Sequence, residues 1–201
     1  MSNKAYSRLD ATDRRAQLLE IGCELFATRP YDEVWIDHVA DKAGVSRGLL
    51  YHHFENKRVF LHAIVEHETR AILEATKPDV ALPSEDRLLG ALDQYFRYVE
   101  AHPHGYRTLF RGAPATDSEV RKLIDDNLTR QEKRIVSALS AGGTGNDRHR
   151  LIVRGWIGLV ITVALDWLDH KQMSTEEVRD LCADALLRLV ATGSAGVPTS
   201  N

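Results

Sequence analysis

The sequence predicts an all-α protein with about nine helices: a three-helix domain that contains a helix-turn-helix, followed by a larger helical domain. Apolar residues recur at helical spacing between the prolines and glycines, and no segment has the sustained apolar–polar alternation of an exposed strand. The chain has 201 residues, of which 43% are hydrophobic and 27% are charged. It is therefore long enough to bury a core and too apolar to be disordered.

The first two helices follow from caps and chain breakers. Thr12 or Asp13 caps the first helix, which ends at Arg29, directly before a proline. The second helix covers residues 35–43. Gly44 follows it and supplies the left-handed residue with which many helices end.

Two more helices complete the N-terminal part. Ser46 caps a short third helix that runs to about His52, and Asn56 caps a fourth that runs to about Thr76. Two prolines then mark a linker within residues 78–83.

Five further helices are expected in the larger domain, with a flexible glycine-rich break at residues 141–145. Their predicted ranges are 84–101, 104–110, 118–140, 147–170 and 175–190. The predicted domains are an N-terminal domain of residues 1–66, a C-terminal domain of residues 67–192 and a flexible tail of residues 193–201.

The predicted helix 147–170 is apolar nearly all round, so it must be buried on nearly all sides. Together with helix 175–190, it buries its apolar surface most simply against a second copy of itself. We therefore predict a homodimer through the last two helices, since closed twofold dimers are the commonest soluble oligomers. The alternative is that both helices belong to the core of a monomer.

Composition excludes several other classes of protein. The two cysteines, Cys23 and Cys182, are too few for a disulfide scaffold or a four-cysteine zinc site, and they fit a reducing cytoplasm. The polar residues 1–13 lack the apolar stretch of a secretory signal. The uncharged stretch 155–165 is shorter than the roughly 20 residues that span a bilayer, so we expect a buried helix and no membrane partner.

The charge balance limits how the chain could bind nucleic acid. The net charge is −3, and residues 1–60 contain nine basic and nine acidic residues. A DNA-binding surface must therefore come from the placement of charges on one face, because the chain has no overall excess of positive charge.

Residues 34–58 carry the most informative pattern: a helix, a tight turn and a second helix. Ala40 is small where the two helices would cross, and Gly44 lies at the turn four residues later. Val45 and Leu50 would bury the second helix against the first. This is the layout of a helix-turn-helix, whose second helix lies in the major groove of DNA.

The second helix of this motif has residues that suit DNA binding. Ser46 and Arg47 lie at its N-terminus, where the helix dipole favours a phosphate, and Arg47 can also contact guanine through two hydrogen bonds. Gly48 permits close approach of the backbone. Further candidate contacts to phosphates or base edges are Tyr51, His52, His53 and Lys57. The alternative is an ordinary three-helix packing unit.

The pattern Ala40-x-x-Ala-Gly-Val-Ser-x-Gly-x-Leu-Tyr-x-His-Phe-x-x-Lys57, preceded by Leu25-Phe26-Ala27, resembles the DNA-binding domain of the TetR family of transcriptional regulators. The resemblance covers about residues 12–66. It implies a homodimeric regulator, usually a repressor, that binds a palindromic operator in double-stranded DNA. It also implies release of the DNA by a small molecule held in the C-terminal domain.

The resemblance also implies roles for individual residues. Those that would face the groove are Arg47, Gly48, Leu49 and His52. Those that would lie at the DNA backbone are Ser46, Tyr51, His53 and Lys57. Trp35 stands where the family commonly has Thr or Ser; it cannot cap the second helix, but its indole N–H can still donate to a phosphate.

We expect the small molecule to be largely apolar, because the residues that would line its pocket are apolar or aromatic. They are Phe96, Val99, Tyr106, Phe110, Ile124, Leu128, Trp156 and Val160. Asn127 and Gln131, four residues apart, would orient the ligand. The alternative is that the aromatic residues are ordinary core residues and that the two amides face solvent.

No cofactor, metal or catalytic site is expected. His102 and His104 form the best pair among the nine histidines, but no cysteine or carboxylate cluster adjoins them. The sequence contains no phosphate-binding glycine loop and no Glu-x-x-His motif. We therefore predict that the protein is not an enzyme. The rival hypothesis is a helical ligand-binding protein or enzyme in which the helix-turn-helix pattern is coincidental.

Overall fold

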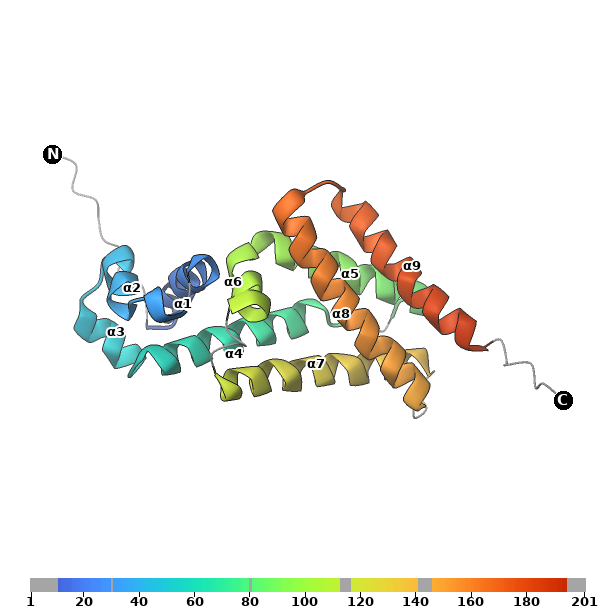
Figure 1. Ribbon diagram of the computed structural model, residues 1–201, viewed down its shortest axis with the longest axis horizontal. Helices are drawn as coiled ribbons and strands as arrows, with labels where there is room; N and C mark the ends of the chain where they lie inside the picture. The colour runs from blue at the N-terminus through green and yellow to red at the C-terminus, as the bar shows by residue number, and fades with distance from the viewer. Residues whose placement is uncertain (1–10, 30, 80, 113–116, 141–145, 195–201) are drawn as a thin grey trace. The chain divides into compact units, whose positions relative to one another are not determined.

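The computed structural model describes residues 11–29, 31–79, 81–112, 117–140 and 146–194 (Figure 1). Within these residues the chain forms nine α-helices and no strand, which confirms the predicted all-α class. The α-helices are α1 (Ala11–Thr28), α2 (Ile36–Ala43), α3 (Arg47–His53), α4 (Lys57–Ala75), α5 (Ser84–Ala101), α6 (Pro103–Arg107), α7 (Ser118–Leu139), α8 (Asp147–His170) and α9 (Thr175–Ser194). Two short turns of other helix types are η1 (Tyr31–Glu33, 3-10) and η2 (Thr108–Gly112, π).

The helix bounds agree closely with the predictions, and α5 and α8 have the predicted ends. The Asn56 side chain accepts the Val59 backbone N–H at 3.0 Å and so caps α4 as predicted. The predicted cap of α1 is wrong. The chain is already helical at Ala11, so Thr12 and Asp13 lie within the first turn.

Two other segments differ from the prediction. The expected helix 104–110 is instead the short α-helix α6 followed by the π-helical turn η2. Thr108, the first residue of η2, donates through Oγ1 to the Cys23 carbonyl at 3.0 Å and holds this turn against α1. The helix α9 continues to Ser194, into the predicted tail. The rest of that tail and the predicted break at 141–145 lie outside the described residues.

The residues form two compact units, which we describe separately. The first contains Met1–Glu68 and His104–Arg121, and the second contains Thr69–Pro103 and Lys122–Asn201. The segment from His104 therefore packs with the N-terminal part of the chain, although it lies far along the sequence. The predicted functional boundary between residues 66 and 67 stays a prediction.

The core of the first unit is made by aromatic and aliphatic residues of α1 to α4. Phe54 and Phe60 are both buried, and their ring centroids lie 4.7 Å apart. Gly22 of α1 faces Phe60 and Ile64 of α4. A Cβ there would overlap the Phe60 ring and the end of Ile64, so only glycine lets α1 lie this close to α4.

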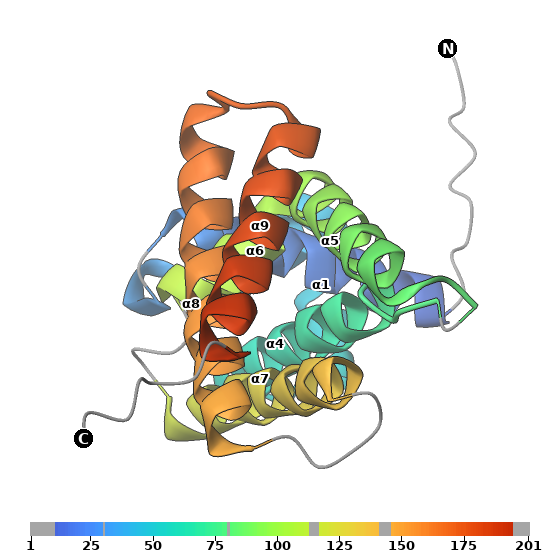
Figure 2. The same cartoon turned by 90° about the vertical axis from the view of Figure 1, so that its right-hand side faces the viewer.

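In the second unit α8 and α9 lie side by side, and α5 packs against α9 (Figure 2). The Phe96 ring meets the Trp167 ring edge-on, with the centroids 5.7 Å apart. The indole N–H of Trp156 donates to the Cys182 carbonyl at 2.7 Å, so this large ring is buried without an unpaired polar atom.

The helix α8 is, by length and composition alone, apolar enough to cross a bilayer. Seven of its residues are nevertheless buried in the second unit, Trp156 and Trp167 among them. The hydrogen-bonded indole of Trp156 and the packing against α9 are those of a core helix. We therefore interpret α8 as a core helix of this unit. It is not buried on nearly all sides within one protomer, because Leu151 and Leu159 are exposed.

The close approach at Gly22 predicts an unequal effect of two glycine substitutions in the first unit. Gly22→Ala should lower the free energy of unfolding by about 1–3 kcal/mol, because the Phe60 ring must shift. Gly48→Ala, whose Cβ would meet only Ser46 Oγ at 4.0 Å, should leave it unchanged or raise it by up to about 1 kcal/mol. Denaturant unfolding of both variants measures the difference, and equal effects would contradict the packing argument.

Candidate nucleic-acid interface

The turn between α2 and α3 has the geometry that the sequence predicted. Gly44 ends α2 in the left-handed conformation, with φ 66° and ψ 33°. The Val45 backbone N–H donates to the Ala40 carbonyl at 3.0 Å, which closes the turn. Ala40 itself is fully buried.

The helix α3 buries one of its side chains in the first unit. Among its seven residues, all of which the structure describes, Leu50 is buried and the others are exposed or half-buried. Ser46 caps the helix as predicted, because its side chain accepts the Leu49 backbone N–H at 3.2 Å. A short helix held in this way leaves most of its surface accessible to a partner.

The structure brings the predicted DNA-contacting residues together on α3 and the segments that flank it. Those on or beside α3 that are exposed are Ser46, Arg47, Gly48, Leu49, Tyr51 and His52. His53 and Lys57 are half-buried. Figure 1 shows α3 between α2 and the start of α4, which carries Lys57 as its first residue.

Trp35 occupies the N-cap position of α2 and, as predicted, makes no side-chain cap. Trp35 is 65% exposed, which is unusual for a residue with so large an apolar side chain.

Asp37 lies in the first turn of α2, where its negative charge is favoured by the helix dipole. The side chain of Asp37 also reaches α3: its Oδ2 lies 3.1 Å from Nη1 of Arg47. This contact between α2 and α3 was not predicted from the sequence.

His53 and Lys57 have lowered pKa values. Partial burial is the largest cause for His53, followed by the neighbouring His52 and by two arginines of α1. Burial also lowers the pKa of Lys57. Since the pKa of an ordinary histidine is about 6.5, His53 is neutral at neutral pH and acts there as a hydrogen-bonding group.

The residues predicted to line a ligand pocket are divided between the two units. Tyr106 and Phe110 belong to the first unit, where their ring centroids lie 4.9 Å apart. The other eight belong to the second unit. Among these, Phe96, Val99, Ile124, Trp156 and Val160 are buried.

The two amides predicted to orient a ligand are bound to the protein itself. Asn127 is buried and its Nδ2 donates to the Thr69 carbonyl at 2.8 Å. Gln131 Nε2 donates to Asn127 Oδ1 at 2.9 Å. Asn127 therefore does not face solvent, and a ligand that bound these amides would have to share or replace one of these bonds.

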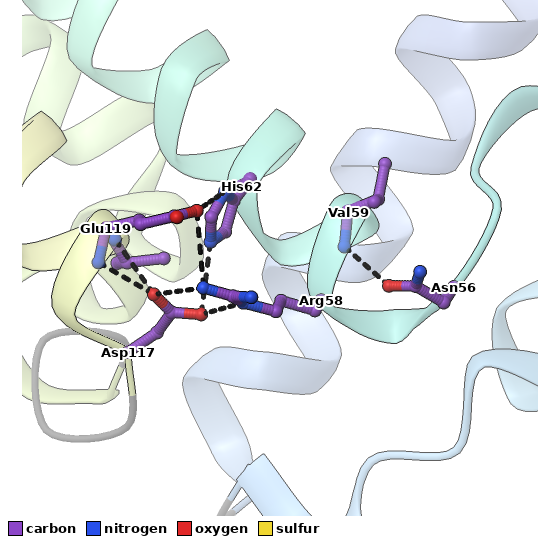
Figure 3. A network of polar contacts seen from close by, with 7 residues as sticks. Asn56, Arg58, Val59, His62, Asp117 and Glu119 are labelled. Carbon is purple, nitrogen blue, oxygen red and sulfur yellow. Dashed lines mark hydrogen bonds and ion pairs between the residues drawn. The ribbon is translucent and has the colours of Figure 1, made fainter.

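A polar network of the first unit, shown in Figure 3, was not found from the sequence. Arg58 of α4 donates through Nε to Asp117 Oδ2 at 2.6 Å, and its Nη2 lies 3.2 Å from Glu119 Oε2. His62 Nε2 lies 3.1 Å from the same Asp117 oxygen. The other oxygen of Asp117 accepts the Glu119 backbone N–H at 2.8 Å and caps α7.

Within the described residues, the side chains of His62, Asp117 and Glu119 lie close enough to hold a metal ion. The Arg58 guanidinium already pairs with both carboxylates, and its positive charge would repel a cation. We therefore interpret the group as an ion-pair network that joins the start of α4 to the start of α7. Residues so far apart in the sequence leave no local signal from which to predict it.

The two cysteines are buried. Burial raises the pKa of Cys182 to about 11, and burial together with Glu68 raises that of Cys23 further. Both are therefore protonated thiols at neutral pH, the unreactive form.

Comparison with known proteins gives consistent matches. Residues 18–64 match the family model described as bacterial regulatory proteins, tetR family, and residues 84–189 match the one described as tetracyclin repressor-like, C-terminal domain. The chain is 28% identical over 173 residues to the HTH-type transcriptional activator FasR of Mycolicibacterium smegmatis, covering 84% of this chain and 78% of that protein.

Two further proteins are similar over much of the chain. The HTH-type transcriptional repressor KstR2 of Mycobacterium tuberculosis is 30% identical over 138 residues, which are 64% of this chain and 66% of that protein. A tetR-family transcriptional regulator from Streptomyces coelicolor has a crystal structure that is similar with a TM-score of 0.80 and 31% identity, covering 93% of this chain and 84% of that one. These relatives are transcriptional regulators and not enzymes.

The network of Figure 3 predicts a pH-dependent stability. Arg58 holds the pKa of Asp117 well below its usual range, so the stabilisation is fully present above the ordinary pKa and is lost as the pH falls below it. Asp117→Asn keeps a side chain that can cap α7 but removes the charge. It should lower the free energy of unfolding by about 1 kcal/mol at neutral pH. This cost should shrink between about pH 5 and pH 2.

Denaturant unfolding of wild type and Asp117→Asn at a series of pH values measures this effect. Asp126→Asn, which removes an exposed charge from the same helix, is the matched control and should show no such change. A cost of Asp117→Asn that stayed constant down to low pH would mean that the ion pair does not stabilise the fold.

Proposed function

The chain belongs to the TetR family of transcriptional regulators, and we propose that it acts as a homodimer that binds a palindromic DNA operator and is released by a largely apolar small molecule. The observation that carries the DNA-binding part is the exposure of α3, in which Leu50 is the one buried residue among seven described residues. Such a helix can enter the major groove without first detaching from the protein.

In this proposal α3 reads the operator from its N-terminal end. The residues that face base edges are Arg47, Gly48, Leu49 and His52. The contacts to the DNA backbone come from Trp35, Ser46, Tyr51, His53 and Lys57. Arg47 forms the most specific contact, to the O6 and N7 atoms of a guanine, and Leu49 is placed for apolar contact with a thymine methyl group.

The dimer is supported by an exposed stripe along α8. Leu151 and Leu159 are exposed on this helix, and Gly155 and Gly158 lie on the same side. A Cβ at either glycine would meet no atom of the protomer within 4 Å. Glycine inside a helix costs about 0.5–1 kcal/mol relative to alanine, and a second copy packed closely against the stripe would offset that cost.

The helix α9 contributes to the same proposed interface. Leu181 and Leu189, eight residues apart and so on the same side of the helix, are each at least 40% exposed on it. Two α3 helices of a dimer would have to lie on the order of 34–36 Å apart to occupy two half-sites on one face of B-DNA. A ligand that favours a different separation would weaken DNA binding, and such couplings are typically about 1–3 kcal/mol.

We place the effector site in the second unit, among the apolar side chains of α5, α7 and α8. The residues that would contact the ligand are Phe96, Val99, Ile124, Leu128, Trp156 and Val160, with Asn127 and Gln131 as its polar partners. Tyr106 and Phe110 belong to the first unit and are not part of this proposed site. A lining of this kind favours an apolar effector with few polar groups.

We propose repression, in the cytoplasm, as the direction of regulation. A dimer represses by occluding the DNA that it covers, whereas activation requires an additional surface for the transcription machinery. One relative is named an activator and another a repressor, so this choice rests on the simpler requirement.

Operator binding is tested with the duplex that lies upstream of the protein's own coding sequence. We predict a specific mobility-shift complex that weakens steeply with salt, because phosphate contacts release counterions. Arg47→Ala should reduce discrimination between this duplex and a scrambled one by roughly tenfold or more. Arg97→Ala, an exposed arginine of α5, is the control. Equal binding of both duplexes by wild type would refute the proposal.

The proposed dimer interface predicts the effect of a large side chain on α8. Gly158→Leu should fold normally, since the protomer offers open space there, but should shift the protein from dimer to monomer and abolish operator binding. Gly90→Leu, at a glycine of α5 whose Cβ also meets nothing, should leave both unchanged. Sedimentation and mobility shift measure the two properties, and a Gly158→Leu dimer of normal affinity would place the interface elsewhere.

A further inference from the structure

Arg47 of α3 forms an ion pair with a carboxylate of α2. It is the first residue of α3, and its Nη1 lies 3.1 Å from Oδ2 of Asp37, the second residue of α2. The Arg47 side chain is 66% exposed and that of Asp37 is 31% exposed. One edge of the guanidinium therefore meets the carboxylate, while most of the side chain remains accessible from solvent.

The fold gains little from this ion pair. Exposed pairs contribute little to stability, because water screens them and two side chains lose freedom. The second carboxylate oxygen of Asp37, Oδ1, is buried and accepts no hydrogen bond from the described residues, which is unfavourable for a charged group. The helix dipole of α2 offsets part of that cost. Folding alone does not account for a carboxylate at this position.

DNA affinity does not account for it either. A negative charge beside the reading helix repels the phosphates, and it neutralises part of the charge of Arg47. Both effects weaken binding to any DNA sequence. What Asp37 can improve is the geometry of Arg47, since a guanine is recognised only when the planar guanidinium presents two N–H groups to O6 and N7.

We propose that Asp37 is a positioning residue that makes Arg47 selective for a base. This inference rests on the proposed operator binding. An arginine with all its rotamers available contacts the nearest phosphate, and phosphate contacts carry no sequence information. Asp37 restricts those rotamers and lowers the attraction to phosphate. The N–H groups that it leaves accessible favour a guanine in the major groove.

The experiment selects bound duplexes from a random-sequence pool with the full-length protein and compares four variants with wild type. Asp37→Asn removes the charge and keeps the shape. Asp41→Asn removes an exposed charge from the same helix and is the control. Arg47→Ala and the double variant Asp37→Asn/Arg47→Ala show whether Asp37 acts through Arg47.

We expect Asp37→Asn to bind a scrambled duplex more tightly than wild type does. The ratio of its affinities for the selected and the scrambled duplex should fall by on the order of tenfold, and its base preference should relax at one position of each half-site. Asp41→Asn should keep the wild-type preference. In the Arg47→Ala background, Asp37→Asn should cause no further loss of preference. If Asp37→Asn lowers the melting temperature, Asp37→Ser, a good first-turn residue, replaces it.

Two outcomes would overturn the inference, and they are distinguishable. If wild type selects a sequence and Asp37→Asn selects the same one with the same discrimination, Asp37 does not position Arg47, while the proposed function stands. If wild type selects no sequence, operator binding itself fails, and the role of Asp37 fails with it.

Discussion

Leu50 attaches α3 to the first unit, and the orientation of every proposed DNA contact depends on that attachment. All seven residues of α3 are described, and Leu50 is the one that is buried, so the turn before the helix must fix its direction. The left-handed Gly44 and the fully buried Ala40 do this, because they let α2 and α3 approach closely. A side chain at either position that opened this turn would misdirect the whole reading surface.

The placement of charge, rather than its total, makes DNA binding compatible with a net charge of −3. Arg47 and Lys57 are the first residues of α3 and α4, and most residues of α3 are exposed. Two acidic residues of the first unit form ion pairs with arginines: Asp37 with Arg47, and Asp117 with Arg58. Each pairing limits repulsion of phosphate and holds a basic side chain in one direction.

Local features of the fold could be predicted from the sequence, because they depend on residues that are close in the chain. The Gly44 turn and the Ser46 and Asn56 caps are of this kind. Contacts between distant segments could not, since periodicity does not specify which helix faces meet: Asn127 on Thr69 is an example. The pair of Asp37 and Arg47 lies between these cases, because it follows only once the angle of the turn is known.

Chemical protection of guanine N7 on a selected duplex tests most directly whether α3 occupies the major groove twice per dimer. Guanine N7 lies in the major groove, so the account predicts two protected patches on one face of the DNA, about one helical turn or a multiple of it apart. Arg47→Ala should lose protection at one guanine in each patch. A single protected patch, or a bound duplex in which no guanine N7 is protected, would contradict the account.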